Sequence, residues 1–114
     1  MPVVGIGGIF LRSKDPKRLG DWYHQHFGLE NGGATPTQAG PLVFATFDQD
    51  TDYFGGSQAF MVNLRVSDLE GLLGQLRTAG VTEAKPQETM EGIGRFAWVN
   101  DPEGNRIELW EPAP

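Results

Sequence analysis

The sequence predicts an α+β domain made of two related halves, and three observations carry this prediction. In each half an apolar run is followed by an Asp suited to cap a helix, an amphipathic stretch and a terminating Gly. The peptide Arg12-Ser13-Lys14-Asp15 resembles Arg65-Val66-Ser67-Asp68, and Gly28-Leu29 resembles Gly80-Val81. The chain then closes with two strand-like runs around a turn-forming sequence at residues 100–105, which indicates a hairpin.

The length of the chain and the repeat together favour one domain. At 114 residues with 39% hydrophobic content, the chain can bury one core but not two independent ones. A single βαβββ module cannot bury both its helix and the inner face of its sheet, so a tandem pair is the natural minimum. We therefore expect one domain over residues 1–114, built from two pseudo-repeats of about 1–56 and 57–114.

In the first half we expect a strand over residues 3–12, then a helix, and a second strand over residues 42–48. Asp15-Pro16 provides an N-cap followed by a proline at the first helical position. Gly28 is placed to end the helix in a left-handed conformation. The apolar stripe of the helix consists of Leu19, Trp22, Tyr23, His26 and Phe27. Residues 30–41, rich in Gly, Thr and Pro, form either a short edge strand or a loop.

The second half repeats this order. A strand over residues 59–66 precedes a helix for which Ser67 and Glu70, three positions apart, form a candidate capping box. Gly80 is the expected C-cap. The apolar stripe of this helix consists of Leu69, Leu72, Leu73 and Leu76.

The remaining residues form the last three strands. We expect a strand over residues 81–85, a turn over 88–94 and the closing hairpin, in which Pro102 and Gly104 favour the turn. Side chains alternate between the two faces of a strand, so Ile107 and Leu109 of the last strand point to one face. The other face carries Arg106, Glu108 and Trp110.

Composition excludes several classes of function. The absence of cysteine excludes disulfides, thiolate metal sites and cysteine nucleophiles, and it is compatible with a reducing compartment. The net charge is −6 and no basic stripe with interleaved aromatic residues occurs, so we expect neither nucleic acid nor membrane as a partner. No apolar run approaches the roughly 18 residues that span a bilayer, and the N-terminus has no basic region. We expect a soluble, cytoplasmic protein.

The chain resembles the vicinal oxygen chelate superfamily, which includes glyoxalase I, extradiol dioxygenases, methylmalonyl-CoA epimerase and the fosfomycin and bleomycin resistance proteins. Residues 101–109 and the strand–Asp–helix–Gly units at 11–28 and 64–80 carry the resemblance, which covers nearly the whole chain. It implies paired βαβββ modules that form a cupped, half-barrel sheet, with helices on the convex side and the site on the concave face. It also implies a homodimer, because such sheets commonly pair edge to edge in this family.

The resemblance also implies where metal ligands would lie in the metal-dependent members. The corresponding positions are Gly8, Met61, a residue within 42–48 (Thr46 or a Phe) and Glu108. Neither Gly8 nor Met61 offers a side chain that binds a hard divalent cation. The two histidines of the chain, His24 and His26, lie on the first helix. We therefore expect no metal and no other cofactor.

Without a metal, the concave face is expected to bind a small hydrophobic or aromatic molecule. The candidate ligand-binding residues are Phe10, Arg12, Met61, Asn63, Arg65, Arg95, Phe96, Trp98 and Trp110. In the penultimate strand two registers are open, with either Phe96 and Trp98 or else Arg95 facing the site. The aromatic side chains either stack on a ligand or belong to the core. Residues 48–52 form an acidic turn, and Asp52 and Tyr53 are further candidates for the rim of the site.

Glu108 is the candidate catalytic residue, and its role has two interpretations. It acts as a proton-transfer base in a metal-independent lyase or isomerase, with an arginine holding the substrate. Alternatively, it forms a structural ion pair with Arg12 or Arg65. The main hypothesis is a glyoxalase-like or bleomycin-resistance-like binding protein without the metal site. Two further hypotheses are a metal-dependent glyoxalase or dioxygenase, and an interaction module with exposed edge strands.

Overall fold

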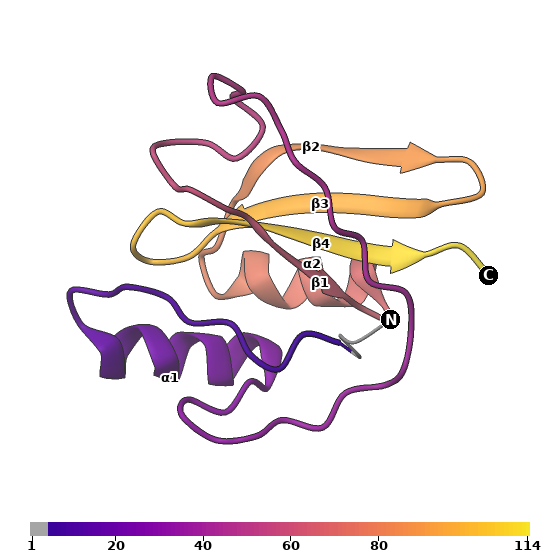
Figure 1. The fold of residues 1–114 in the computed structure, drawn as a ribbon. Helices are drawn as coiled ribbons and strands as arrows, with labels where there is room; N and C mark the ends of the chain where they lie inside the picture. The colour runs from indigo at the N-terminus through magenta and orange to yellow at the C-terminus, as the bar shows by residue number, and fades with distance from the viewer. Residues whose placement is uncertain (1–4) are drawn as a thin grey trace. The chain divides into compact units, whose positions relative to one another are not determined.

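The computed structural model describes residues 5–114 and contains six regular elements (Figure 1). In chain order they are α1 (Pro16–Phe27), β1 (Val62–Arg65), α2 (Leu69–Thr78), β2 (Glu83–Met90), β3 (Gly94–Asn100) and β4 (Arg106–Pro112). The chain divides into two compact units, the first ending at Thr51 and the second spanning Asp52–Pro114.

The second unit has the predicted βαβββ order and contains all four strands of the described residues. The strands form one sheet in the order β1-β4-β3-β2. β1 runs parallel to β4, whereas the β4–β3 and β3–β2 pairs are antiparallel. The sheet is open and curved, and α2 covers one of its faces (Figure 1). The predicted α+β class is therefore confirmed.

The core of the second unit lies between α2 and the sheet face that it covers. Side chains alternate along β3 and β4, so every second residue of each strand is directed towards α2. The buried side chains, each at most 1% exposed, are Leu69, Leu73, Leu76, Ala97, Val99, Ile107 and Leu109. Burying an aliphatic side chain of this size contributes about 1.5–3 kcal/mol to the free energy of unfolding.

The N-terminus of α2 is capped by the Asp expected from the repeat, one residue after the Ser of the candidate capping box. Asp68, rather than Ser67, is the N-cap, and its Oδ1 accepts a hydrogen bond from the Gly71 N–H at 3.0 Å. A second carboxylate, Glu111 on β4, accepts the Leu69 N–H at 2.9 Å. Because Asp68 is the N-cap, Ser67 lies one residue before it, and the predicted capping box of Ser67 and Glu70 is wrong. The contact of Glu111 with the helix is one that the local sequence does not reveal.

The C-terminus of α2 follows the prediction more closely. Ala79 is the capping residue, and Gly80 follows it with a φ of +85°. The Val81 N–H donates to the Leu76 carbonyl at 2.8 Å, which closes the last turn. The glycine is needed because few other residues adopt this left-handed conformation at low cost.

Two strand lengths differ from the prediction. β1 is shorter than the expected strand over 59–66, and β2 continues to Met90, so the turn before β3 occupies only residues 91–93. The outer half of β2 is exposed and pairs with β3 through backbone hydrogen bonds. Because such pairing needs no apolar side chains, the hydrophobic pattern ends before the strand does.

In the first unit α1 is the predicted helix. The Asp15 Oδ1 accepts the Arg18 N–H at 3.2 Å, and Pro16 is the first helical residue. Gly28, with a φ of +72°, ends the helix and donates its N–H to the His24 carbonyl at 2.9 Å. Along one side of α1 the Trp22 ring makes edge contacts with the rings of Tyr23, His26 and Phe27.

The predicted strands of the first half are absent from the described residues. Residues 5–12 and 42–48 form no strand, and residues 3 and 4 of the first predicted strand lie outside the described part. A β-strand requires a neighbouring strand for its backbone groups, and these segments have no such partner within residues 5–51. Their apolar side chains are correspondingly exposed, as in Phe10 (91%), Phe44 (83%) and Val43 (74%).

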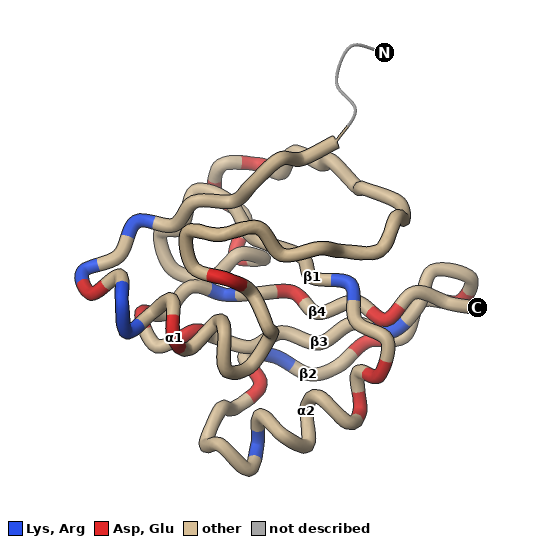
Figure 2. Tube along the Cα trace, turned by 90° about the horizontal axis from the view of Figure 1, so that it is seen from below, with Lys and Arg blue, Asp and Glu red and all other residues tan. Residues whose placement is uncertain are grey.

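Lys and Arg are scattered among Asp and Glu along the trace of the chain (Figure 2). Neither described helix is long and apolar enough to cross a membrane. The expectation that nucleic acid is not a partner stays a prediction.

Candidate functional site

Glu108 on β4 is a buried acid on the sheet face opposite α2, which we call the Glu108 face. Its side chain is 8% exposed. Tyr53 donates its O–H to Oε2, Trp98 donates its Nε1–H to Oε2 at 2.9 Å, and Asn63 donates from Nδ2 to Oε1 at 2.6 Å. A buried carboxylate is tolerated only when its oxygens accept hydrogen bonds. These three donors therefore account for the burial of the charge.

The sheet register brings two of the three donors to Glu108. Asn63 is paired with Glu108 across the parallel β1–β4 ladder, and Trp98 is paired with it across the antiparallel β3–β4 ladder. Side chains at paired positions share a face and lie about 5 Å apart at Cβ. Because β4 lies between β1 and β3, its carboxylate receives one donor from each side.

The third donor, Tyr53, comes from residues 52–58, which precede β1 and which we call the strap. Arg106 donates from Nη1 to the Tyr53 carbonyl at 3.0 Å. The Gln58 side chain bonds both backbone groups of Arg106, accepting its N–H at 2.7 Å and donating to its carbonyl at 3.1 Å. Gly55, with a φ of +71°, allows close approach, because a Cβ there would lie 2.9 Å from the Arg106 Cζ. The strap is thus fastened to the start of β4.

Lys85 on β2 places a positive charge beside the aromatic donors. Its Nζ lies 4.2 Å from the centroid of the Trp98 ring and 4.6 Å from that of Tyr53, which are cation–π distances. The same two rings donate hydrogen bonds to Glu108. The ammonium and the carboxylate therefore bind opposite features of these rings, the π face and the polar edge.

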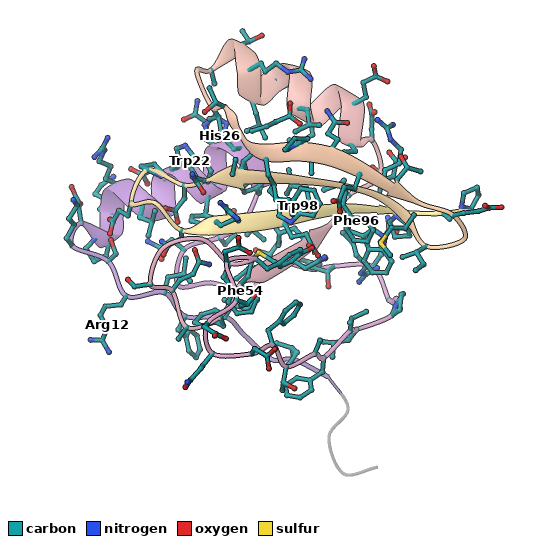
Figure 3. All side chains as sticks on the ribbon, turned by 90° about the horizontal axis from the view of Figure 1, so that it is seen from above. Arg12, Trp22, His26, Phe54, Phe96 and Trp98 are labelled. Atoms are coloured by element: carbon teal, nitrogen blue, oxygen red, sulfur yellow. The ribbon has the colours of Figure 1, made fainter. Side chains whose placement is uncertain are left out.

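Three aromatic rings stack across β3 and β4 and form what we call the aromatic ladder. Phe96 lies 6.0 Å from Trp110 at an interplanar angle of 2°, and 6.3 Å from Trp98 at 17° (Figure 3 labels Phe96 and Trp98). Trp98 is fully buried and Trp110 is 8% exposed, so both behave as core residues. Phe96 is only partly buried, which makes it the ring of the ladder that a ligand can reach.

The structure places some predicted site residues together and separates others. Asn63, Arg65, Phe96, Trp98 and Trp110 share the Glu108 face. Arg95 lies on the other face, paired with Glu111, and donates to Gln87 Oε1 at 3.4 Å. Met61 precedes β1. Phe10 and Arg12 belong to the first unit, outside any strand.

The partners of Glu108 and the position of Lys85 differ from what the sequence analysis considered. The hydrogen bonds to the Glu108 carboxylate come from a phenol, an indole and an amide, so an ion pair with an arginine is not needed to account for its burial. Lys85 is absent from the predicted set, and Tyr53, predicted only at the rim, reaches the buried acid. Lys85 is paired with Trp98 in the β2–β3 ladder, and this pairing places it at the site. The lysine could be predicted only by a reader who already knew the register of these two strands.

The surroundings of Glu108 do not fit a metal centre. The Tyr53 hydroxyl, the Trp98 N–H and the Asn63 amide present hydrogens to the carboxylate, whereas a metal ion requires lone pairs. Among residues 5–114 there is no group of three His, Cys, Asp or Glu side chains that could hold an ion.

Burial raises the pKa of Tyr53 above its ordinary value, and the hydrogen bond to Glu108 raises this pKa further. Both effects favour the neutral phenol over the phenolate. Tyr53 is therefore a hydrogen-bond donor at neutral pH.

We expect the free energy of unfolding to fall as the pH rises above about 10. In the unfolded chain Tyr53 loses its proton near that pH, whereas the folded chain retains it to a higher pH. The folded state then binds more protons, so raising the pH favours unfolding. Chemical denaturation at several alkaline pH values should show a smaller decline for Tyr53→Phe, while Tyr23→Phe, which keeps Tyr53, should decline as the wild type does. An identical decline in all three proteins would contradict this assignment.

Comparison with known proteins relates the chain to one superfamily. The family model for the Glyoxalase/Bleomycin resistance protein/Dioxygenase superfamily matches residues 5–109. No curated protein matches the chain in sequence.

Solved structures share the fold. TnmS3, an antibiotic binding protein from Streptomyces sp. CB03234, has a TM-score of 0.64, 22% identity and coverage of 99% of each chain. A member of the same superfamily from Sphaerobacter thermophilus DSM 20745 has a TM-score of 0.63 and 21% identity, covering 97% of this chain and 99% of that one. TioX from Micromonospora sp. ML1 has a TM-score of 0.57 and 21% identity, covering 89% of this chain and 93% of that one.

Proposed function

Because the chain belongs to the glyoxalase/bleomycin resistance protein/dioxygenase superfamily, we propose that it binds a small hydrophobic or aromatic molecule on the Glu108 face, without a metal. The observation that carries the proposal is the combination of the aromatic ladder and a buried, hydrogen-bonded carboxylate on one face of the sheet. Apolar surface with a few oriented polar groups is the usual composition of a small-molecule site. TnmS3, which has the same fold, is an antibiotic binding protein.

The hydrogen bonds of Glu108 favour binding over proton transfer. Both of its oxygens are engaged by groups of the protein, so a substrate proton reaches the carboxylate only if Tyr53 or Asn63 moves away. A metal-independent lyase or isomerase with Glu108 as the base is the second candidate, supported by the burial of this acid. In that case Glu108→Gln abolishes turnover while the protein remains folded, and turnover that survives the substitution excludes the second candidate.

We expect planar aromatic antibiotics to stabilise the protein and aliphatic metabolites of similar size to leave it unchanged. A ligand that binds only the folded state stabilises it by about 2.7 kcal/mol at a concentration one hundred times Kd. Phe96→Ala removes a stacking ring and should weaken binding about tenfold, whereas Arg95→Ala, on the other face of the same strand, should leave it unchanged. Thermal shift and calorimetric titration measure both effects. A broad panel without any upward shift in Tm would refute the proposal.

We expect the purified protein to contain no stoichiometric metal, because the groups around Glu108 donate hydrogens to it. Adding Ni²⁺, Mn²⁺, Fe²⁺ or Zn²⁺ should not raise its Tm. Elemental analysis and a thermal shift series test this. Near-stoichiometric metal would instead support a metal-dependent glyoxalase or dioxygenase.

We also propose that the protein is a homodimer in which a second copy covers the apolar side chains of the first unit. The exposed residues are Ile6, Ile9, Phe10, Leu42, Val43 and Phe44. They lie in two segments with the composition of strands but no strand structure. A corresponding segment of the second half does pair, as β1 with β4. Exposed apolar clusters of this kind are typical of protein interfaces.

Light scattering after gel filtration should give the mass of a dimer for the wild type. The double substitution Phe10→Ser and Phe44→Ser should give a monomer, because it removes the two most exposed large apolar side chains. Gln25→Ser, at an exposed polar position of α1, is the control and should remain dimeric. A monomeric wild type would contradict the proposal.

A cytoplasmic location remains an expectation from the absence of cysteine. Fractionation of cells that produce the protein tests it, and recovery outside the cytoplasm would refute it.

A further inference from the structure

The Tyr53 side chain indicates which ligand chemistry the Glu108 face recognises. Its ring is the part of the site that does not belong to the sheet, because Tyr53 comes from the strap. We propose that the site binds aromatic compounds that carry a phenolic hydroxyl, and that Tyr53 occupies the place of that phenol in the free protein. This inference rests on the proposed function and names its ligand class.

Three contacts with the sheet define the position of the phenol. The hydroxyl donates to Glu108 Oε2, the ring meets Trp98 edge-on at 6.0 Å and 86°, and the Lys85 ammonium lies 4.6 Å from the ring centroid. The carboxylate recognises the O–H donor, the indole recognises the shape of the ring, and the ammonium recognises its π face. None of these contacts depends on the main chain of Tyr53. A free phenol of the same shape can make all three.

The Tyr53 ring can leave this position while the strap stays on β4. Arg106 binds the backbone carbonyl of Tyr53, and Gln58 binds the backbone of Arg106, so neither contact involves the phenol. A change of the Tyr53 χ1 rotamer therefore removes the hydroxyl from Glu108 without unfastening the strap. Asn63 and Trp98 continue to donate to the carboxylate, and an incoming hydroxyl replaces the donor that Tyr53 withdrew.

The same surroundings select neutral phenols. An anionic ligand oxygen placed where the Tyr53 hydroxyl lies would face the Glu108 carboxylate and be repelled. The raised pKa of Tyr53 agrees with this selection, since burial here disfavours the phenolate. Beyond Trp98, the partly exposed Phe96 continues the aromatic ladder, so further rings of a larger phenol have a surface to stack on.

The probe that tests this inference is p-cresol, which is the tyrosine side chain cut at Cβ, and toluene is the matched compound without the hydroxyl. Tyr53→Ala removes the resident phenol. We expect p-cresol to raise the Tm of this variant and to bind it at least about tenfold more tightly than toluene, because only p-cresol satisfies Glu108. The wild type should bind p-cresol more weakly than the variant, since Tyr53 competes for the same position.

A second measurement uses the wild type and does not depend on the folding of the variant. The chain contains only two tyrosines, so ring-labelled protein gives NMR signals from Tyr23 and Tyr53, and Tyr23→Phe assigns them. Titration with p-cresol should shift the Tyr53 signal and leave that of Tyr23 in place, with a much smaller effect of toluene.

Equal affinity for p-cresol and toluene, or a Tyr53 signal that does not move, would overturn the inference. Its failure is distinguishable from failure of the proposed function. If planar antibiotics bind but p-cresol shows no preference over toluene, only the phenolic class is wrong. If no compound binds either the wild type or Tyr53→Ala, the small-molecule site itself is wrong.

Discussion

Hydrogen bonding to the Glu108 carboxylate is the constraint on which the arrangement of the second unit depends. An isolated buried charge would cost several kcal/mol, so the folded state requires donors at both of its oxygens. The donors come from three separate segments, β1, β3 and the strap. All three donors reach the carboxylate only when β4 lies between β1 and β3 in the observed register and the strap is held at the start of β4. The carboxylate thereby links the topology of the sheet to the chemistry of its face.

One face of β4 contributes to the core, and the other face contributes to the candidate site. Ile107 and Leu109 pack under α2, while Glu108 and Trp110 lie on the opposite face. Glu111 adds a third role, because its carboxylate accepts the first N–H of α2. The side chains of a strand alternate between the two faces of the sheet. A slip of one residue in the register would therefore place Glu108 and Trp110 under α2 and move Ile107 and Leu109 to the opposite face. The core and the candidate site are therefore specified by the same ladder of backbone hydrogen bonds.

The two halves of the chain show how similar local patterns give different results. Each half has a helix with an Asp N-cap and with a glycine of positive φ at its C-cap or directly after it. In the second half the helix packs on one face of a four-stranded sheet, whereas residues 5–51 contain no strand. The apolar segments of the first half retain the composition of strands, and Phe10 and Phe44 within them are exposed.

The sequence by itself determined the features that depend on neighbours close in the chain. These are the α+β class, the two helices with their terminal glycines, the closing hairpin, and the face of β4 on which Glu108 lies, because capping and alternation act over a few residues. Only the tertiary structure decided the features whose partners are distant in sequence. Glu111 of β4 accepts the first N–H of α2, Phe96 rather than Arg95 lies on the Glu108 face, and no strand forms within residues 5–51.

The candidate site divides in the same way. Glu108 and Trp110 follow from strand parity, and Trp98 belongs to one of the two registers left open, but Tyr53 and Lys85 reach the site from the strap and from an edge strand. No local pattern encodes those contacts, since they depend on how the strap and β2 lie against β3 and β4. The alternation of side chains along a strand specifies a face, and only the folded sheet specifies which side chains share it.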